Sequence, residues 1–597
     1  MIVQKFERTG YCGNITEAFL GKEVTVAGWV HRRRDHGGLI FVDLRDRSGL
    51  VQIVFNPDIA QSVHDLAHSL RSEYVVSIKG KVVERSKETV NKDLPTGKIE
   101  IQATGLHVFS KSKTPPFALD DSHNNNIDEE LRLKYRYLDL RRDEMQKRIA
   151  FRDKVSFLIR EFLHEDGFYD IETPILTKNT PEGAREFIVP SRITHGHFYA
   201  LPQSPQIYKQ LLMAGGLEKY YQIARCFRDE DLRADRQPEF TQIDIEMSFV
   251  TEADIIDMIE RMFAHMFDKL YGKKLQLPFP RMSYDEAFAK YGSDKPDLRF
   301  GLDIRDLTTL FANTELKFLR TVLDNKGKIG ALHVSAKSYQ FSRSELVKWV
   351  DKAIELGAKG LLWIRIAEDG TIESPVANFL APDFVEQVKT IFPELQNGDT
   401  LFLMAGKYQE AWTLLGRLRL RLAKELNLIP ADAGFNLSWV TDFPLFEYDE
   451  ESKTWNSVHH PFTAPQDGWE HIPTADIKAR AYDLVCNGIE LGGGSIRIYE
   501  AEMQSKVFDM LGISKEDAQK RFGFLLESQL YGFPPLGGLA LGLDRLVMIL
   551  SGAQSIREVI AFPKTARGYD PMMDSPTSVT DQQLADYGLR LVKPVKK

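Results

Sequence analysis

The segment formed by residues 225–244 constrains the fold of this chain more than any other part of its sequence. It holds six acids, four arginines and two aromatic residues within twenty positions. On both sides, at residues 221–224 and 241–247, the side chains alternate with period two, which is typical of half-buried strands. We therefore expect two antiparallel strands joined by a charged loop. Such a hairpin can present Arg228 as a fixed fork for a phosphate and Phe240 as a flat surface for a base.

The residues of this segment also carry a family resemblance. Phe-Arg-Asp-Glu followed by Arg-x-x-x-Gln-Pro-Glu-Phe-Thr-Gln resembles motif 2 of the class II aminoacyl-tRNA synthetases, and most closely the bacterial-type aspartyl-tRNA synthetases. The alternative is a charged hairpin kept on the surface for solubility. Two further motifs of the same family, placed where that family needs them, favour the resemblance.

Those two motifs flank the charged segment in sequence. A helix expected over residues 143–166 ends at Gly167 and leads into a strand closed by Pro174, which resembles motif 1. In the family, that helix and strand form the homodimer interface. Residues 537–550 have the order strand, glycine, Asp-Arg and helix, which resembles motif 3. Taken alone, this last run would equally suit a glycine-rich turn into an apolar helix with a buried ion pair.

A length of 597 residues predicts several domains. Before residue 109, five strand-like runs with one helix before the fourth suggest an OB barrel. The resemblance implies a class II catalytic domain, an antiparallel sheet flanked by helices, interrupted by a bacterial-type α+β insertion. The predicted multidomain α+β organisation is barrel 1–109, hinge 110–143, catalytic domain 144–298 and 430–564, insertion domain 299–429 and C-terminal tail 565–597.

Composition excludes several other classes of protein. The chain is 43% hydrophobic and 27% charged, and no apolar run reaches membrane-spanning length. The first residues lack the apolar core of a signal peptide. The three cysteines are far apart, without disulfide or zinc-site spacing. We therefore expect a cytoplasmic protein without a membrane segment.

The distribution of charge is more informative than the total. A net charge of −8 gives no argument for a nucleic-acid partner. Residues 131–148, however, hold seven basic residues against three acids, and residues 32–34 are all arginine. Runs of charged residues usually lie on solvated faces. The position of these two basic runs beside an expected oligonucleotide-binding barrel favours contact with phosphates.

The resemblance implies a site for ATP with Mg²⁺. Arg228 would contact the α-phosphate and the amino-acid carboxylate, Arg545 the γ-phosphate, and both would be catalytic together with Glu490. Asp483 and Glu490 would hold Mg²⁺ with the phosphates, because Mg²⁺ commonly takes two carboxylates plus phosphate oxygens. The glycine run 492–494 could equally form a bulge or tight turn. The full set of implied ATP contacts is Arg228, Asp229, Glu230, Gln237, Phe240, Glu490, Gly542, Leu543, Asp544 and Arg545.

The resemblance also implies selection of aspartate. Lys209 and Arg497 would hold the side-chain carboxylate, so asparagine would leave two buried cations unpaired and glutamate would be too long. Glu182 would lie on a mobile loop that closes over the substrate. Of the adjacent pair His459 and His460, the resemblance favours His459 as the substrate contact, and the alternative for the pair is a hydrogen-bonded core role. The implied aspartate-binding residues are Glu182, Ser204, Gln206, Lys209, Arg228, Asp244, His459 and Arg497.

No residue needs to act as a nucleophile in this chemistry. The substrate carboxylate attacks the α-phosphorus, and the terminal ribose hydroxyl of tRNA then attacks the aspartyl carbonyl. In the family the adenylate phosphate is thought to serve as base in the second step. Positioning and charge stabilisation therefore supply most of the catalysis.

The N-terminal segment resembles the anticodon-binding barrel of the same family. Carried over by position, Phe41 would stack on the central anticodon base, Gln52 would bond a base edge, and Arg34 would contact a base or phosphate. Phe41 could alternatively be a core residue of the barrel. His36 and Thr89 depart from the leucine and asparagine of strictly aspartate-specific members. Such changes accompany relaxed reading of the third anticodon base, which leaves open whether tRNA-Asn is charged besides tRNA-Asp.

The expected function is thus a homodimeric aspartate-tRNA ligase that uses ATP and Mg²⁺. The alternatives are an asparaginyl-tRNA synthetase, a ring-forming ligase on the same catalytic domain, or a non-catalytic tRNA-binding paralogue. Lysyl specificity would need acids at Lys209 and Arg497. A non-catalytic paralogue would be expected to have lost Arg228, Glu490 or Arg545, and all three are present.

Overall fold

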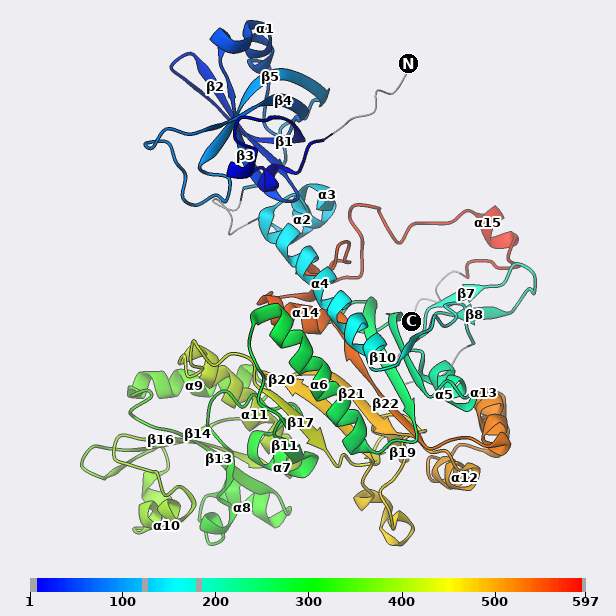
Figure 1. Ribbon diagram of the computed structural model, residues 1–597. Helices are drawn as coiled ribbons and strands as arrows, with labels where there is room; N and C mark the ends of the chain where they lie inside the picture. Colours follow the sequence, from blue (N-terminus) through cyan, green and yellow to red (C-terminus); the bar gives the residue numbers. More distant parts are fainter. Residues whose placement is uncertain (1–7, 121–126, 179–184, 593–597) are drawn as a thin grey trace. The chain divides into compact units, whose positions relative to one another are not determined.

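The computed structural model describes residues 8–120, 127–178 and 185–592 (Figure 1). The chain divides into two compact units, which are described separately. One comprises Met1–Asp153 and Ala553–Ser578, and the other comprises Lys154–Gly552 and Val579–Lys597. The predicted domain boundaries remain predictions, but the five-stranded barrel and the antiparallel catalytic sheet flanked by helices are confirmed.

The first unit contains a closed barrel with strand order β1-β2-β3-β5-β4. Alternate residues of β2, among them Ile40, Val42 and Leu44, fill its interior. Strand β1 includes the basic residues 32–34, which pair with β2, and the pairing extends to His36. The elements are β1 (Glu23–His36), β2 (Leu39–Asp46), β3 (Gly49–Phe55), α1 (Pro57–Ala67), β4 (Val75–Glu84) and β5 (Ile99–Ser110).

The segment after the barrel is helical in part, where the sequence suggested an irregular hinge. It forms α2 (Glu129–Lys134) and α3 (Arg136–Asp139), and α4 (Asp143–Glu165) follows. The carboxylate of Asp139 accepts hydrogen bonds from Arg132, Arg136 and Arg142. A buried carboxylate with three guanidinium partners stabilises two helices too short to form alone.

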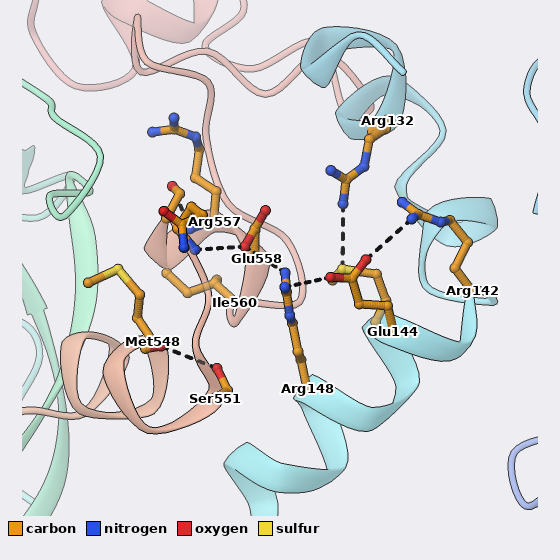
Figure 2. Close-up of polar contacts among 12 residues, drawn as sticks. Arg132, Arg142, Glu144, Arg148, Met548, Ser551, Arg557, Glu558 and Ile560 are labelled. Carbon is orange, nitrogen blue, oxygen red and sulfur yellow. Dashed lines mark hydrogen bonds and ion pairs between the residues drawn. The ribbon is translucent and has the colours of Figure 1, made fainter. Parts of the chain in front are cut away.

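The same arginines bind residues 553–578 within the first unit. Arg136 donates to the carbonyl oxygens of Arg557, Ile560 and Ala561. Figure 2 shows Arg148 between Glu144 and Glu558, with which it forms two ion pairs. A segment late in the sequence is therefore held by one that precedes the catalytic sheet.

The second unit is built on an eight-stranded sheet with order β11-β17-β20-β21-β22-β10-β9-β6. Its central strands are antiparallel, β11 and β6 add parallel edges, and α6 lies along the sheet (Figure 1). The predicted hairpin is the β9–β10 pair, with Asp244 opposite Gln222. The strands are β6 (Tyr169–Asp170), β9 (Lys219–Phe227), β10 (Glu239–Ser248), β11 (Arg281–Ser283), β17 (Leu437–Thr441), β20 (Ala481–Cys486), β21 (Ile489–Ile496) and β22 (Leu536–Gly542).

The glycine run lies inside strand β21 rather than in a tight turn. A Cβ at Gly492 would lie 2.0 Å from the carbonyl oxygen of Ala540, and one at Gly494 would lie 2.1 Å from that of Gly538. These glycines let β21 and β22 approach closely. On the other side of β21, its pairing with β20 shifts register between Leu484 and Val485.

Helices and short hairpins surround this sheet. Two of the helices, α5 and α14, carry predicted site residues. The helices of this unit after β6 are α5 (Gln206–Ala214), α6 (Glu252–Tyr271), α7 (Tyr284–Tyr291), α12 (Ala501–Met510), α13 (Lys515–Ser528), α14 (Leu543–Ser551) and α15 (Asp581–Ala585), apart from those of the separate sheet described below. The hairpins are β7 (Ile188–Pro190) with β8 (Phe198–Ala200), and β18 (Phe446–Asp449) with β19 (Thr454–Ser457).

A separate five-stranded sheet with order β12-β13-β16-β14-β15 interrupts the catalytic sheet in sequence, between β11 and β17. Trp349 and Trp412 belong to the core on one side, and Phe384 belongs to a second core. The elements are β12 (Arg305–Asp306), α8 (Lys317–Asp324), β13 (Lys328–Val334), α9 (Arg343–Glu355), β14 (Leu362–Ile366), β15 (Ile372–Glu373), α10 (Phe384–Ile391), β16 (Thr400–Gly406) and α11 (Tyr408–Glu425).

Candidate active site

Four buried charges form the centre of the site. Lys209 of α5 lies 2.7 Å from Asp244 Oδ1 and 3.2 Å from Glu246 Oε2. Arg497, which follows β21, places its Nε 2.9 Å from Glu246 Oε1 and its Nη2 3.1 Å from Glu246 Oε2. The side chains are at most 2% exposed. Asp244 and Glu246 share one face of β10 because they are two residues apart on a strand.

The two carboxylates of this cluster differ in their pKa. Burial alone would raise the pKa of Glu246, but Arg497 and Lys209 outweigh it and lower that pKa. Burial raises the pKa of Asp244, which Lys209 only partly offsets. Asp244 Oδ2 is buried without a hydrogen-bond partner. Asp244 therefore has an acceptor available for a cationic donor such as an amino group.

Arg497 is also held from its other side. Its Nη1 donates to Ser495 Oγ at 2.6 Å and lies 2.8 Å from His460 Nε2, which must accept because a guanidinium can only donate. Burial, and then the charge of Arg497, lowers the pKa of His460 well below its ordinary value. His460 therefore stays neutral near pH 7 and orients the arginine.

His459, which the sequence favoured over His460 as the substrate contact, has different neighbours. Its Nε2 lies 3.7 Å from Asp483 Oδ1, and its ring packs edge-on against Phe443. Its Nδ1 is buried without a hydrogen-bond partner. His459 thus lies beside a predicted metal ligand, whereas His460 contacts the arginine predicted to bind aspartate.

The β9–β10 loop carries the predicted ATP contacts. The Arg228 guanidinium lies over the Phe240 ring, 5.1 Å from its centroid, and Arg228 Nε is buried without a partner. A cation–π contact of this kind holds the guanidinium in place while leaving donors available. Glu230 Oε2 lies 3.1 Å from Arg236 Nη1. Asp229 is exposed, and Gln237 is buried.

The β22–α14 junction carries the remaining ATP contacts. Gly542 ends β22, and Leu543 is buried. Asp544 Oδ2 accepts from the backbone N–H of Thr241 at 2.7 Å, so its side chain ties α14 to β10. Arg545 Nη1 donates to the carbonyl oxygen of Glu490 at 2.7 Å. The junction thereby aims Arg545 toward the strand that bears Glu490.

Asp483 and Glu490 suit a divalent cation. Burial, and then the neighbouring charge of Asp483, raises the pKa of Glu490. Two partly buried carboxylates that repel one another are stabilised by a cation between them. No cluster of three or more metal-ligating side chains occurs among the described residues. Mg²⁺ at this position would thus need ligands from phosphate or water, as is usual for that ion.

Gln206 is the first residue of α5, the helix that carries Lys209, and Ser204 lies two residues before it. The Gln206 backbone N–H donates to Ser204 Oγ at 3.3 Å. Gln206 is buried, and its Nε2 has no hydrogen-bond partner. The amide therefore has a donor available within the site. Glu182 lies outside the described residues.

The five predicted anticodon-reading residues line one groove of about 1520 Å³ on the barrel unit. Phe41 is half-buried on the face of β2 opposite the core residues Ile40 and Val42, so the core alternative is wrong. Arg34 donates to Asp43 at 3.0 Å, and Gln52 Nε2 donates to Glu100 Oε2 at 2.9 Å. The predicted residues in the groove are Arg34, His36, Phe41, Gln52 and Thr89.

Comparison with known proteins decides the family. The family model of class II tRNA synthetases (D, K and N) matches residues 128–566, and that of the OB-fold nucleic acid binding domain matches residues 24–109. The chain is a class II tRNA synthetase of the D, K and N group. No helix among the described residues is long and apolar enough to cross a membrane.

Relatives match this synthetase along its whole length. The aspartate–tRNA ligase of Bacillus licheniformis is 51% identical, over 99% of this chain and 100% of that protein. The aspartate–tRNA(Asp/Asn) ligase of Anoxybacillus flavithermus is 50% identical over the same shares. The structure of asparaginyl-tRNA synthetase from Pyrococcus horikoshii covers 94% of this chain and 98% of its own, with a TM-score of 0.58 and 19% identity, and so supports the fold.

Two site residues were missed from the sequence. Glu246 binds both predicted aspartate-binding cations, and its position two residues after Asp244 on a period-two strand was an available signal. His460 contacts Arg497, whereas the family resemblance favoured its neighbour His459 as the substrate contact.

Proposed function

We propose that this chain ligates L-aspartate to tRNA in two steps, with aspartyl-adenylate as intermediate. The observation that carries the proposal is the buried cluster of Lys209, Arg497, Asp244 and Glu246. Lys209 and Arg497 present cations to the aspartate side chain, and Asp244 Oδ2 presents an acceptor to its amino group. The full-length relatives named as aspartate–tRNA ligases support the same substrate.

Activation needs the aspartate α-carboxylate held in line with the α-phosphorus of ATP. Attack by a carboxylate oxygen forms the acyl–phosphate bond, and pyrophosphate leaves with the electrons of the broken P–O bond. Arg228, held over Phe240, would stabilise the charge on the α-phosphate and orient the carboxylate. Arg545 would bind the γ-phosphate, and Phe240 would offer a ring to adenine.

Mg²⁺ would be held by Asp483 and Glu490 together with phosphate oxygens. It would supply charge neutralisation at the phosphates. The buried, mutually repelling carboxylates are the feature of this chain that fits it. Glu230 and Gln237 would then fix the base rather than the phosphates.

The groove of the barrel would bind the anticodon of tRNA-Asp. Phe41 offers an aromatic face outside the core, and Arg34 and Gln52 offer donors beside it. His36 and Thr89 line the same groove, and one full-length relative is named for both tRNA-Asp and tRNA-Asn. We therefore include tRNA-Asn as a second substrate, which would be charged with aspartate.

A homodimer is part of the proposal. Phe157 of α4, Tyr169 of β6 and the following Leu176 expose more than half of their surface. Phe157 and Tyr169 belong to the segment that resembles motif 1, the dimerisation motif of the family, and Leu176 lies two residues after it. Sedimentation at micromolar concentration should give twice the chain mass, and a chain that stays monomeric would contradict a dimer. A cytoplasmic location follows from the proposed substrates.

Charging of purified tRNAs tests the proposed reaction. Radiolabelled aspartate should become acid-precipitable with tRNA-Asp, and with tRNA-Asn if the barrel reads the third base loosely. Absence of product with tRNA-Asn would restrict the function to tRNA-Asp. Absence of product with both tRNAs would end the proposal.

A further inference from the structure

The loop between β9 and β10 places two adjacent side chains, those of Asp235 and Arg236, against proposed ATP contacts. Asp235 Oδ2 lies 3.3 Å from Arg545 Nη2. Arg236 Nη1 lies 3.1 Å from Glu230 Oε2. Asp235 thus neutralises Arg545, the residue proposed to bind the γ-phosphate. Arg236 neutralises Glu230, a residue proposed to bind the adenine base.

The position of Arg545 makes the first of these contacts informative. Its Nη1 is already directed to the carbonyl oxygen of Glu490 at 2.7 Å. Asp235 therefore occupies Nη2 on the other side of the guanidinium. Carboxylate and phosphate oxygens are both anionic acceptors that fit the same guanidinium donors. A γ-phosphate bound by Arg545 would compete with Asp235 for that position.

We propose that Asp235 is a placeholder for the terminal phosphate of ATP. Before ATP binds, Asp235 holds the charge of Arg545, and the nucleotide displaces it as the loop moves. This inference rests on the proposed role of Arg545 in ATP binding. Asp235 thereby lowers the affinity for ATP while it keeps the empty site ordered.

The ion pair is weak enough to be displaced. The Arg545 side chain is 23% exposed and that of Asp235 is 39% exposed, so solvent screens their attraction. ATP brings several negative charges against the single charge of Asp235. A partly exposed pair of this kind should alter ATP affinity by about two- to fivefold rather than by orders of magnitude.

The opposite role for Asp235 predicts an effect of the opposite sign. If Asp235 stayed on Arg545 and oriented it in the ATP complex, removal of its charge would raise the KM for ATP or lower kcat. If it acts as a placeholder, the same removal lowers the KM and leaves kcat nearly unchanged. The sign of the change in KM therefore separates the two roles.

The test is ATP–pyrophosphate exchange by the full-length chain with Asp235→Asn, which removes the charge and keeps the shape. The KM for ATP should fall about two- to fivefold, kcat should stay within about twofold, and the difference should shrink as salt is raised. Asp235→Ser should shift KM in the same direction. Asp231→Asn is the matched control, because Asp231 is an exposed acid of the same loop.

An unchanged or raised KM in both Asp235 variants overturns the placeholder. An equal fall in the Asp231 variant overturns it too, because the effect would then be general electrostatics. Exchange by the wild-type chain with aspartate as substrate would support the proposed function, whatever the Asp235 variants show. A wild-type chain without exchange would end the proposed function, and the placeholder with it.

Discussion

The fork of Arg497 is the side-chain geometry on which the proposed recognition of aspartate most depends. Arg497 binds Glu246 through two nitrogens and Ser495 through a third. Lysine cannot reproduce this geometry, because it is a point charge without a planar fork. Arg497→Lys should raise the KM for aspartate in pyrophosphate exchange by on the order of 100-fold and change the KM for ATP little.

Arg480→Lys is the matched control for that variant. Arg480 also binds one carboxylate, that of Glu252, through two nitrogens, but it lies outside the aspartate cluster. The KM of this variant for aspartate should stay within about threefold of wild type, because an ion pair whose side chains are 29% and 32% exposed contributes little. Equal effects of the two substitutions would show that Arg497 acts through general stability.

His460 makes a pH-dependent contribution to stability. Burial and Arg497 hold its pKa well below that of the unfolded chain, about 6.5. Below pH 6.5 the unfolded chain therefore binds a proton that the folded chain does not, and stability falls by up to about 1.4 kcal/mol per pH unit. Above pH 6.5 the effect vanishes.

The expected measurement is the melting temperature between pH 7.5 and 5. His460→Gln retains an acceptor for Arg497 and cannot titrate, so its melting temperature should fall less on acidification than that of wild type. The control is His471→Gln, at an exposed position, which should follow wild type. A steeper fall of the melting temperature in the His460 variant would contradict a lowered pKa for His460.

Phe41 is expected to act on tRNA alone. Base stacking on an aromatic residue contributes about 1–3 kcal/mol, so Phe41→Ala should raise the KM for tRNA-Asp by about 10- to 100-fold. Pyrophosphate exchange without tRNA should not change. Tyr11→Ala, at an exposed aromatic outside the groove, is the control. A loss of exchange in the Phe41 variant would mean that the barrel residue is structural.

For single residues, the sequence predicted which charged side chains belong to the candidate site but not all of their partners. Lys209 and Arg497 were found by resemblance. Glu246 was not, although it pairs with both, because its role depends on the register of β10 against the rest of the sheet. Asp235 was also missed, because its partner Arg545 is distant in sequence.

Strand β21 couples the glycine run to a proposed metal ligand. A Cβ at Gly493 would lie 2.1 Å from Asp483 Oδ1, so Gly493→Ala must displace that carboxylate. The Mg²⁺ concentration for half-maximal exchange should rise by on the order of tenfold, as for other changes beside metal ligands. Gly360→Ala, whose Cβ would meet open space, is the control. An unchanged Mg²⁺ requirement with a loss of stability alone would remove Asp483 from the metal site.

Elements with strong periodicity were predicted well, and elements held by distant partners were not. The β9–β10 hairpin and the barrel strands follow period two, and α4 follows a helical pattern with Gly167 after it. Helices α2 and α3 were missed because the ion pairs of Asp139, rather than an apolar face, stabilise them. A charge network of this kind has no local signature in sequence.

For the whole molecule, the two functions assigned to the chain belong to separate compact units. The cluster proposed to bind aspartate, the β9–β10 loop and the β22–α14 junction lie in the second unit, and the groove proposed to bind the anticodon lies in the first. The packing of residues 553–578 with the first unit could not be predicted, because it depends on Arg136 and backbone carbonyls more than 400 positions away. Activation and tRNA selection should therefore be separable by mutation.

The buried cations of the second unit are proposed to select aspartate over asparagine. ATP–pyrophosphate exchange, measured with each of the two amino acids in the absence of tRNA, tests this selection. Asparagine would leave Lys209 and Arg497 without the anion they are placed to bind, so kcat/KM for aspartate should exceed that for asparagine by on the order of 1000-fold or more. Comparable exchange with asparagine, or exchange with neither amino acid, would contradict the account.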